Sequence, residues 1–240
     1  MAPSSKFTSE RFLFLFTCEH ATNKIPFPYQ PLFREARQIL STHRGWDAGA
    51  APVARRMARA CQSPLIEGTH SRLLVDLNRT EDNPGVFSPW TRVLDHGLRQ
   101  TLLQTYHRPH WSRVETEVDR LMKRAQKSGR TLVHLGIHSF TPVMHGYRRP
   151  TALGLLLDPS RPREAAMALE WQKKLRRHSD LVIHRNRPYR GTGNGLISDL
   201  RQRYSPRDYL GLEIELNQNL VESAAAQTKI AKLLLETLPR

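Results

Sequence analysis

The sequence predicts a single α/β domain built on a mixed, mostly parallel sheet with helices on both faces. Short continuous apolar runs alternate with amphipathic segments along the chain, a pattern typical of strands buried between two helical layers. The length of 240 residues suits one compact domain, and no internal repeat or long linker divides it. Fractions of 39% hydrophobic and 25% charged residues are those of a globular protein, which excludes disorder, collagen and coiled coil.

The first half of the chain is expected to supply two buried strands and two helices. Phe12–Thr17 (FLFLFT) is a continuous apolar run, and Leu73–Leu77 (LLVDL) is a second one. Between them, Asp47–Gln62 carries Ala, Val and Met at helical spacing, with an N-cap residue at its start. A long helical stretch is expected over residues 94–127, in which Pro109 could introduce a break.

The second half continues the alternation of strands and helices. The expected elements are strands at Thr131–Ile137 and Ala152–Leu157, a basic amphipathic helix at Arg163–His178, strands at Leu181–His184 and Leu210–Leu216, and a closing helix at Val221–Leu238. Residues 1–10 are polar and are expected to form a flexible leader to a catalytic domain of residues 11–240.

The charge balance raises the question of nucleic-acid binding. The chain has 37 Lys and Arg against 22 Asp and Glu, a formal net charge of +15. Part of this charge clusters at Lys173, Lys174, Arg176 and Arg177, but no RNP-like strand, zinc-finger spacing or helix-turn-helix accompanies it. A basic run is most commonly a solvated face, so we do not expect nucleic acid as a partner. A positive surface would also steer a small acidic substrate toward a cleft.

Membrane spans and cysteine chemistry are not expected to shape the function. No apolar stretch approaches the ~18 residues that span a bilayer. The seven-residue run Phe12–Cys18 is followed by Glu19 and His20 rather than by a cleavage site, so a cytoplasmic protein is expected. Two cysteines, Cys18 and Cys61, exclude a disulfide framework and an all-cysteine zinc site.

Polar clusters lie at the ends of the expected strands or, for the last strand, within it, and open α/β sheets gather reactive groups just past the carboxyl ends of their strands. They are Cys18-Glu19-His20, Asp76-Leu77-Asn78-Arg79, His138-Ser139-Phe140, and the pair Glu213 and Glu215. Two histidines and several carboxylates are the ingredients of a catalytic zinc site, which keeps three protein ligands and one open position. Each cluster also has a plain alternative: a hydrogen-bonded histidine, an Asp cap, or a solvated edge strand. Spacing alone leaves these alternatives open.

A family resemblance favours the catalytic interpretation. The order and spacing of the following segments resemble the N-formylglutamate amidohydrolase family: Cys18–Ala21 (CEHA), Gly45–Ala50 (GWDAGA), Ser71–Arg79 (SRLLVDLNR) and His138–Pro142 (HSFTP), joined by Asn186–Tyr189 (NRPY) and Glu213–Leu220 (EIELNQNL). The resemblance extends over about residues 12–222. The family is distantly similar to the zinc carboxypeptidases, which implies a zinc-exopeptidase-like fold.

The resemblance implies a role for each cluster. His20 and His138 would bind zinc, or another divalent transition metal, with Asp47 as the preferred third ligand and Glu19 as the second choice. Glu215 would be the general base, with Glu213 as the alternative. Arg79, helped by Asn78 and Arg72, would bind a substrate carboxylate.

The implied function is metal-dependent hydrolysis of an N-formyl or N-acyl amino acid such as N-formylglutamate. The alternatives are a carboxypeptidase-like or N-acyl amino-acid deacylase activity, and a basic nucleic-acid-binding protein on a hydrolase scaffold. Asn217 departs from the family pattern, because many relatives have Arg two residues after the base. The segment Gly191–Gly195 could be a flap over the site or a plain surface loop. The sequence predicts no oligomeric state.

Overall fold

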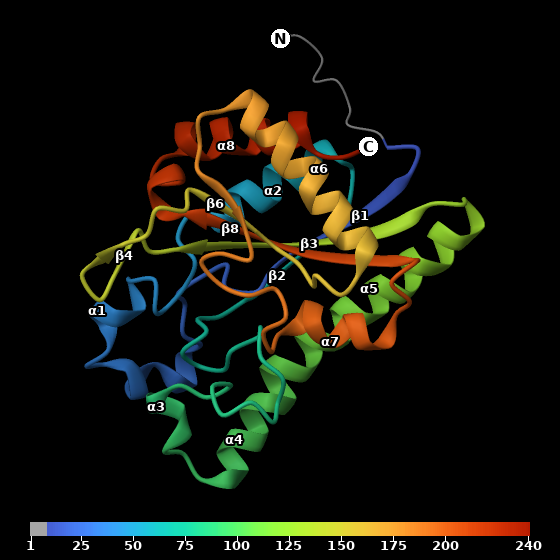
Figure 1. Cartoon of the computed structure of the whole chain (residues 1–240). Coiled ribbons are helices and arrows are strands. Elements are labelled where there is room, and N and C mark those ends of the chain that lie inside the picture. The colour runs from blue at the N-terminus through green and yellow to red at the C-terminus, as the bar shows by residue number, and fades with distance from the viewer. Residues whose placement is uncertain (1–8) are drawn as a thin grey trace.

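A six-stranded sheet forms the centre of the computed structural model, which describes residues 9–240 (Figure 1). The strand order is β2-β1-β3-β8-β6-β7, and every neighbouring pair is parallel except β6 and β8. The strands are β1 (Phe12–Cys18), β2 (Leu65–Glu67), β3 (Thr131–Phe140), β6 (Leu153–Leu156), β7 (Ile183–Arg185) and β8 (Tyr209–Asn217). A separate hairpin comprises β4 (Val143–Met144) and β5 (Tyr147–Arg148). The predicted fold class is confirmed.

Helices cover both faces of the sheet. One face packs against α2 (Ala50–Ala60), α6 (Pro162–His178) and α8 (Ala224–Thr237), and the other against α5 (Arg108–Lys127) and α7 (Leu196–Arg203) (Figure 1). Alternate residues of β1 serve the two faces: Phe14 and Phe16 join one apolar cluster, and Leu13 and Leu15 join the other. This double burial explains the continuous apolar run.

Shorter elements extend from the end of the sheet that carries the functional residues. They are α1 (Arg37–Leu40), α3 (Pro89–Arg92), α4 (His96–Leu102), 3-10 turns at Phe27–Phe33 and Gln218–Leu220, and a π-helical turn at Leu103–His107. Among residues 9–240 no helix is long and apolar enough to cross a membrane. The expected leader over residues 1–10 lies almost wholly outside the described residues.

The expected strand at Leu73–Leu77 is wrong. These residues are buried, but their backbone forms turns, and β2 occupies the edge of the sheet instead. Ring nitrogens, rather than a neighbouring strand, satisfy the carbonyls: His70 Nε2 donates to Val75 O at 3.2 Å, and Trp111 Nε1 donates to Leu77 O at 2.9 Å. The apolar run therefore reflects burial without a sheet ladder.

Pro109 does not break the long helix. The π-turn ends at His107, immediately before α5, and the N–H of Arg108 donates to the carbonyl of Leu103, five residues earlier. Because Pro109 has no N–H to donate, the wider turn re-pairs the backbone just ahead of it. The helical path thus continues from α4 into α5.

Candidate active site

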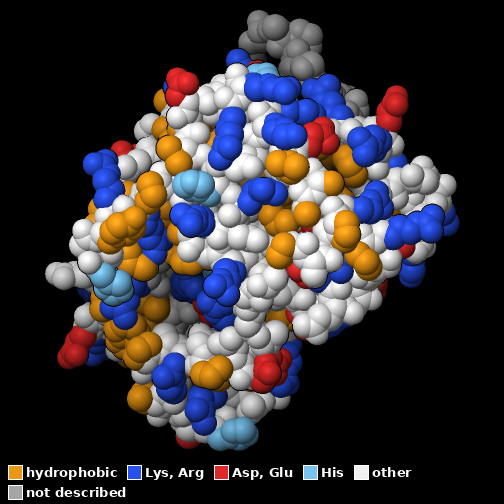
Figure 2. Space-filling view, in the orientation of Figure 1, with side chains coloured by type: hydrophobic (Ala, Val, Ile, Leu, Met, Phe, Trp, Pro, Cys, Tyr) orange, Lys and Arg blue, Asp and Glu red, His pale blue; other side chains and the backbone are white. Residues whose placement is uncertain are grey.

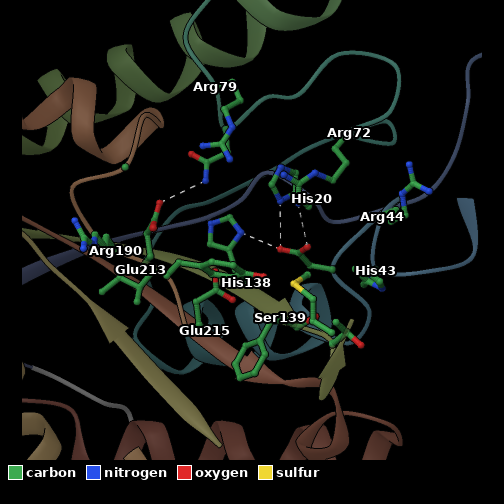
Figure 3. Close-up of a pocket in the computed structure, with 18 of the residues that line it drawn as sticks. His20, His43, Arg44, Arg72, Arg79, His138, Ser139, Arg190, Glu213 and Glu215 are labelled. Atoms are coloured by element: carbon green, nitrogen blue, oxygen red, sulfur yellow. Dashed lines mark hydrogen bonds and ion pairs between the residues drawn. The ribbon is translucent and has the colours of Figure 1, made fainter. Parts of the chain in front are cut away.

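A cavity of about 550 Å³ opens beyond the C-terminal ends of β1, β3 and β8. It lies where parallel strands of an open α/β sheet expose the ends of their backbones and the loops that follow. Figure 3 shows residues from these separate segments converging on it. Most of the residues singled out in the sequence line it: His20, Asp47, Arg72, Asn78, Arg79, His138, Glu213 and Glu215.

Two histidines and an aspartate meet at the floor of the cavity. His20 follows β1, His138 lies near the end of β3, and Asp47 precedes α2, with its backbone N–H bonded to the His20 carbonyl at 3.0 Å. Asp47 Oδ2 lies 3.3 Å from His20 Nδ1 and 2.9 Å from His138 Nδ1. All three side chains are buried, and their potential ligand atoms lie within 4.8 Å of one another.

The other ring nitrogen of each histidine faces a second carboxylate. His20 Nε2 is 2.7 Å from Asp76 Oδ1, and His138 Nε2 is 3.2 Å from Glu19 Oε2. Because an ionised carboxylate only accepts hydrogen bonds, carboxylates on both ring nitrogens favour the doubly protonated form of each imidazole. The structure thus places Asp47 between the two Nδ1 atoms, while Glu19 lies on the far side of His138.

The carboxylates and imidazoles shift each other's pKa values. Burial would raise the pKa of Asp47, but His20 and His138 outweigh it and hold that pKa well below its usual range. Burial likewise opposes ionisation of Glu19, but the contacts with His138, together with His110 and Thr17, outweigh it and lower its pKa to about 2. For His138 the two effects act in the opposite directions: burial would lower its pKa, but the contacts with Asp47 and Glu19 raise it above its usual value. The floor of the cavity therefore favours cations.

Glu215 stands beside His138 in the register of β3 and β8. It is 7% exposed, and within residues 9–240 its Oε2 has no hydrogen-bond partner. Burial, reinforced by the Asp47 and Glu213 charges, raises the pKa of Glu215 to about 8. Glu213 lies two residues earlier on the same face of β8 and accepts a 3.4 Å hydrogen bond from Asn78 Nδ2. The two glutamates thus differ: among the described residues Glu215 Oε2 has no hydrogen-bond partner, whereas Glu213 accepts a hydrogen bond from Asn78.

The three expected substrate-binding residues are held differently. Arg72 donates to Asp76 through Nε at 3.1 Å and Nη2 at 2.7 Å, so its guanidinium supports the Asp76 carboxylate. Asn78 Oδ1 accepts the Leu196 N–H at 2.9 Å, which turns its amide nitrogen toward Glu213. Arg79 Nη1 donates to the backbone carbonyl of Asn194. Of the two arginines, Arg72 binds a buried carboxylate, whereas the guanidinium of Arg79 binds a backbone carbonyl.

The Gly191–Gly195 segment borders the cavity and is attached to its wall. Gly193 and Asn194 line the cavity. Asn194 Oδ1 accepts the Thr80 N–H at 3.0 Å, and its Nδ2 donates to Thr80 Oγ1 at 2.7 Å. Asn217, by contrast, lies outside the cavity and donates to the Thr151 carbonyl at 3.1 Å. Asn217 itself therefore supplies no group to this cavity.

Sequence reasoning missed the basic and aromatic rim of the cavity. His43 and Arg44 lie on one side of the histidine pair and Arg190 on the other (Figure 3). Tyr189 also lines the rim, where the Arg149 guanidinium lies 5.2 Å from its ring centroid. These residues come from loops, so no strand-end spacing marks them. The only sequence signal was the quoted Asn186–Tyr189 motif.

Comparison with known proteins settles the family. A family model described as N-formylglutamate amidohydrolase matches residues 12–222. The chain belongs to this family. Membership confirms the sequence resemblance and makes the chain an amidohydrolase. As a member of the N-formylglutamate amidohydrolase family, it carries the whole His20, Asp47, His138 cluster within the matched residues.

One solved structure supports the same fold. The crystal structure of gene product Atu2144 from Agrobacterium tumefaciens aligns with a TM-score of 0.79 and 31% identity, covering 94% of this chain and 88% of that one. An N-acetylmuramoyl-L-alanine amidase, AmiC2 of Nostoc punctiforme, aligns with a TM-score of 0.40 and 10% identity over 94% of both chains. No protein among the curated sequences compared with this amidohydrolase matches it.

Proposed function

We propose that this amidohydrolase removes the acyl group from an N-formyl or N-acyl amino acid with a free carboxylate, such as N-formylglutamate, in a metal-dependent reaction. The observation that carries the proposal is that His20 Nδ1 and His138 Nδ1 both contact Asp47 Oδ2, and that one potential ligand atom from each of the three residues lies within 4.8 Å of the others. With a cation bound at Nδ1 of each imidazole, the carboxylates of Asp76 and Glu19 would accept the Nε2 proton and orient the rings.

The donor set fits zinc. Two imidazoles and one carboxylate leave a fourth position open, which is the composition of catalytic rather than structural zinc sites. The buried acids surrounding the pair of histidines supply the negative charge that offsets a divalent cation. His20, His138 and Asp47 would hold the ion, and Glu19 and Asp76 would orient the imidazoles. Another divalent transition metal with the same ligand preference would fit the same donors.

Glu215 is suited to move the proton. When bound, zinc supplies a Lewis acid that polarises the amide carbonyl and acidifies water. Glu215, next to His138, would accept a proton from the attacking water and deliver it to the departing nitrogen. Its buried, unpartnered oxygen keeps the carboxylate available for both transfers. A cation on the neighbouring ligands would lower its pKa from about 8 and favour the basic form.

The arginines around the cavity are suited to bind an acidic substrate. Arg79 would exchange the Asn194 carbonyl for a substrate carboxylate, which its planar guanidinium can bind through two hydrogen bonds. Arg44 and Arg190 flank the cavity on opposite sides (Figure 3). Lys and Arg also predominate among the charged side chains on the face shown in Figure 2, in keeping with the net charge of +15. Such a field raises the encounter rate with anions.

A substrate panel tests this function. Purified protein with zinc would be given N-formyl and N-acetyl derivatives of Glu, Asp, Gln and Leu, together with a short peptide that has a free carboxyl terminus. We expect the N-formyl acidic amino acids to be cleaved fastest. Preferential cleavage of the N-acetyl series would assign an N-acyl amino-acid deacylase, and cleavage of the peptide a carboxypeptidase. Cleavage of none of them would reject the proposal.

A further inference from the structure

We propose that His107 is a positioning residue for substrate binding: it fixes the backbone of Arg79 so that the guanidinium meets the substrate carboxylate. The inference rests on the proposed function and adds to it a residue that lies outside the lining of the cavity. His107 is 2% exposed and is the last residue of the π-helical turn.

The contact itself is short and directional. His107 Nε2 lies 2.7 Å from the Arg79 carbonyl oxygen. A carbonyl can only accept, so Nε2 carries the proton and donates it. The His107 ring also stacks on Trp111, with ring centroids 5.2 Å apart and planes inclined by 22°. The imidazole is therefore held in place on one side by the indole and on its edge by the Arg79 backbone.

The end of the π-turn and the start of α5 bind alternate residues of the segment Leu77–Glu81. Trp111 Nε1 donates to the Leu77 carbonyl at 2.9 Å, and Arg108 donates two hydrogen bonds to Glu81, at 2.8 and 2.9 Å. His107 lies between these two attachments in the segment and binds Arg79. The segment has no strand pairing of its own, so these side chains take the place of a sheet ladder.

The π-turn explains how the helical path from α4 to α5 can pack both beside the cavity and against the sheet. Leu102 and Leu103 pack into small apolar clusters beside the cavity, whereas Trp111 and Val114 of α5 face the sheet. A π-turn holds one more residue than an α-turn and so changes the rotational phase between the helices that it joins. The wider turn lets both apolar faces pack and leaves His107 directed at Arg79.

A matched set of variants tests the role. His107→Phe keeps an aromatic ring beside Trp111 but removes the donor, and His107→Asn keeps a polar group that ends short of the carbonyl. His107→Gln can place an amide N–H near the position of Nε2. Arg113→Gln, at an exposed arginine of α5, is the control. KM, kcat and Kd would be measured with N-formylglutamate and with its diamide, which lacks both carboxylates.

The expected pattern separates positioning from general destabilisation. His107→Phe and His107→Asn should raise KM and Kd for N-formylglutamate by about tenfold, the effect of one lost hydrogen bond, with kcat changed less than about twofold. Their Kd for the diamide should not change, and His107→Gln should recover most of the affinity. In an Arg79→Gln background, His107→Phe should have no further effect on KM or Kd.

Contrary results would fall into two kinds. Equal losses for N-formylglutamate and the diamide, or additive losses in the Arg79→Gln background, would overturn the role of His107 and leave the proposed function intact. If the unsubstituted protein with zinc neither binds nor cleaves N-formylglutamate, the proposed function fails, and the role of His107 fails with it.

Discussion

At the scale of single residues, the histidines show what a sequence can and cannot reveal. His20 and His138 stood out because each follows an expected strand, and both line the cavity. Their carboxylate partners could not be assigned from the sequence, because Asp76 is 56 positions from His20 and only the folded chain brings the two together. His107 carries the same imidazole and binds a backbone carbonyl instead. The residue type determines which interactions a histidine can make, and the group that it contacts determines which of them it makes.

Glu215 carries the first prediction at this scale. Glu215→Gln has the same shape but cannot accept a proton, so hydrolysis of N-formylglutamate should fall by about 10²- to 10⁴-fold. Bound zinc, measured by elemental analysis, should stay at the level of the unsubstituted protein. Glu213→Gln is the matched control on the same strand and should reduce turnover far less. Full activity in Glu215→Gln with a large loss in Glu213→Gln would transfer the proton-accepting role to Glu213.

At the scale of elements, the sequence predicted the buried strands well and the loop around Asp76 badly. β1, β3 and β8 occur where apolar runs indicated them, because burial between two helical layers leaves a strong signal. Leu73–Leu77 is an equally apolar run because its side chains are buried, but two of its carbonyls accept hydrogen bonds from ring nitrogens and not from a neighbouring strand. An apolar pattern predicts which residues are buried, but it does not predict which groups form hydrogen bonds with their backbone.

The attachment of the Gly191–Gly195 segment to Thr80 leads to a prediction about the stability of this segment. Asn194→Ala would remove the two side-chain hydrogen bonds to Thr80, each worth about 1 kcal/mol. Amide hydrogen exchange in residues 191–196 should then become faster by about tenfold or more, while exchange in β3 stays unchanged. KM for N-formylglutamate should rise, because the segment whose backbone carbonyl contacts Arg79 is no longer fixed to Thr80. Unchanged exchange in the segment would show that Asn194 does not hold it.

At the scale of the whole molecule, the buried histidines should make stability depend on pH. His134 is fully buried between Thr17 and Tyr209, with ring nitrogens 3.0 and 2.8 Å from their hydroxyl oxygens. Burial lowers its pKa to about 4, and Arg201, His110 and His138 add to the shift, while Glu19 opposes it. Between pH 6.5 and 4 the unfolded chain therefore binds a proton at His134 that the folded chain does not.

His134→Gln tests this dependence. The free energy of unfolding of the unsubstituted protein should fall, relative to that of the variant, as pH falls from 6.5 to 4. The slope should be at most about 1.4 kcal/mol per pH unit, and the difference should level off below pH 4. Urea unfolding at a series of pH values, monitored by circular dichroism, measures both proteins. A difference between them that is independent of pH would show that folding does not lower the pKa of His134.

The whole molecule also explains why the site could be inferred from one chain. A parallel sheet brings the ends of β1, β3 and β8 to one edge, so His20, His138 and Glu215 meet although they are far apart in sequence. Loop residues of the rim, such as Arg44 and Arg190, reach the same cavity by paths that no strand pattern predicts. A net charge of +15 would favour the encounter with the acidic substrate that we propose.

The most direct test of the account is to remove and restore the metal. Protein purified from cells supplied with zinc should contain about one zinc ion per chain, and dialysis against a chelator should abolish hydrolysis of N-formylglutamate until zinc is added back. His138→Ala should lose both the ion and the activity, while the exposed His96→Ala should keep both. Full hydrolysis by protein shown to be free of transition metals, or zinc content unchanged in His138→Ala, would contradict the account.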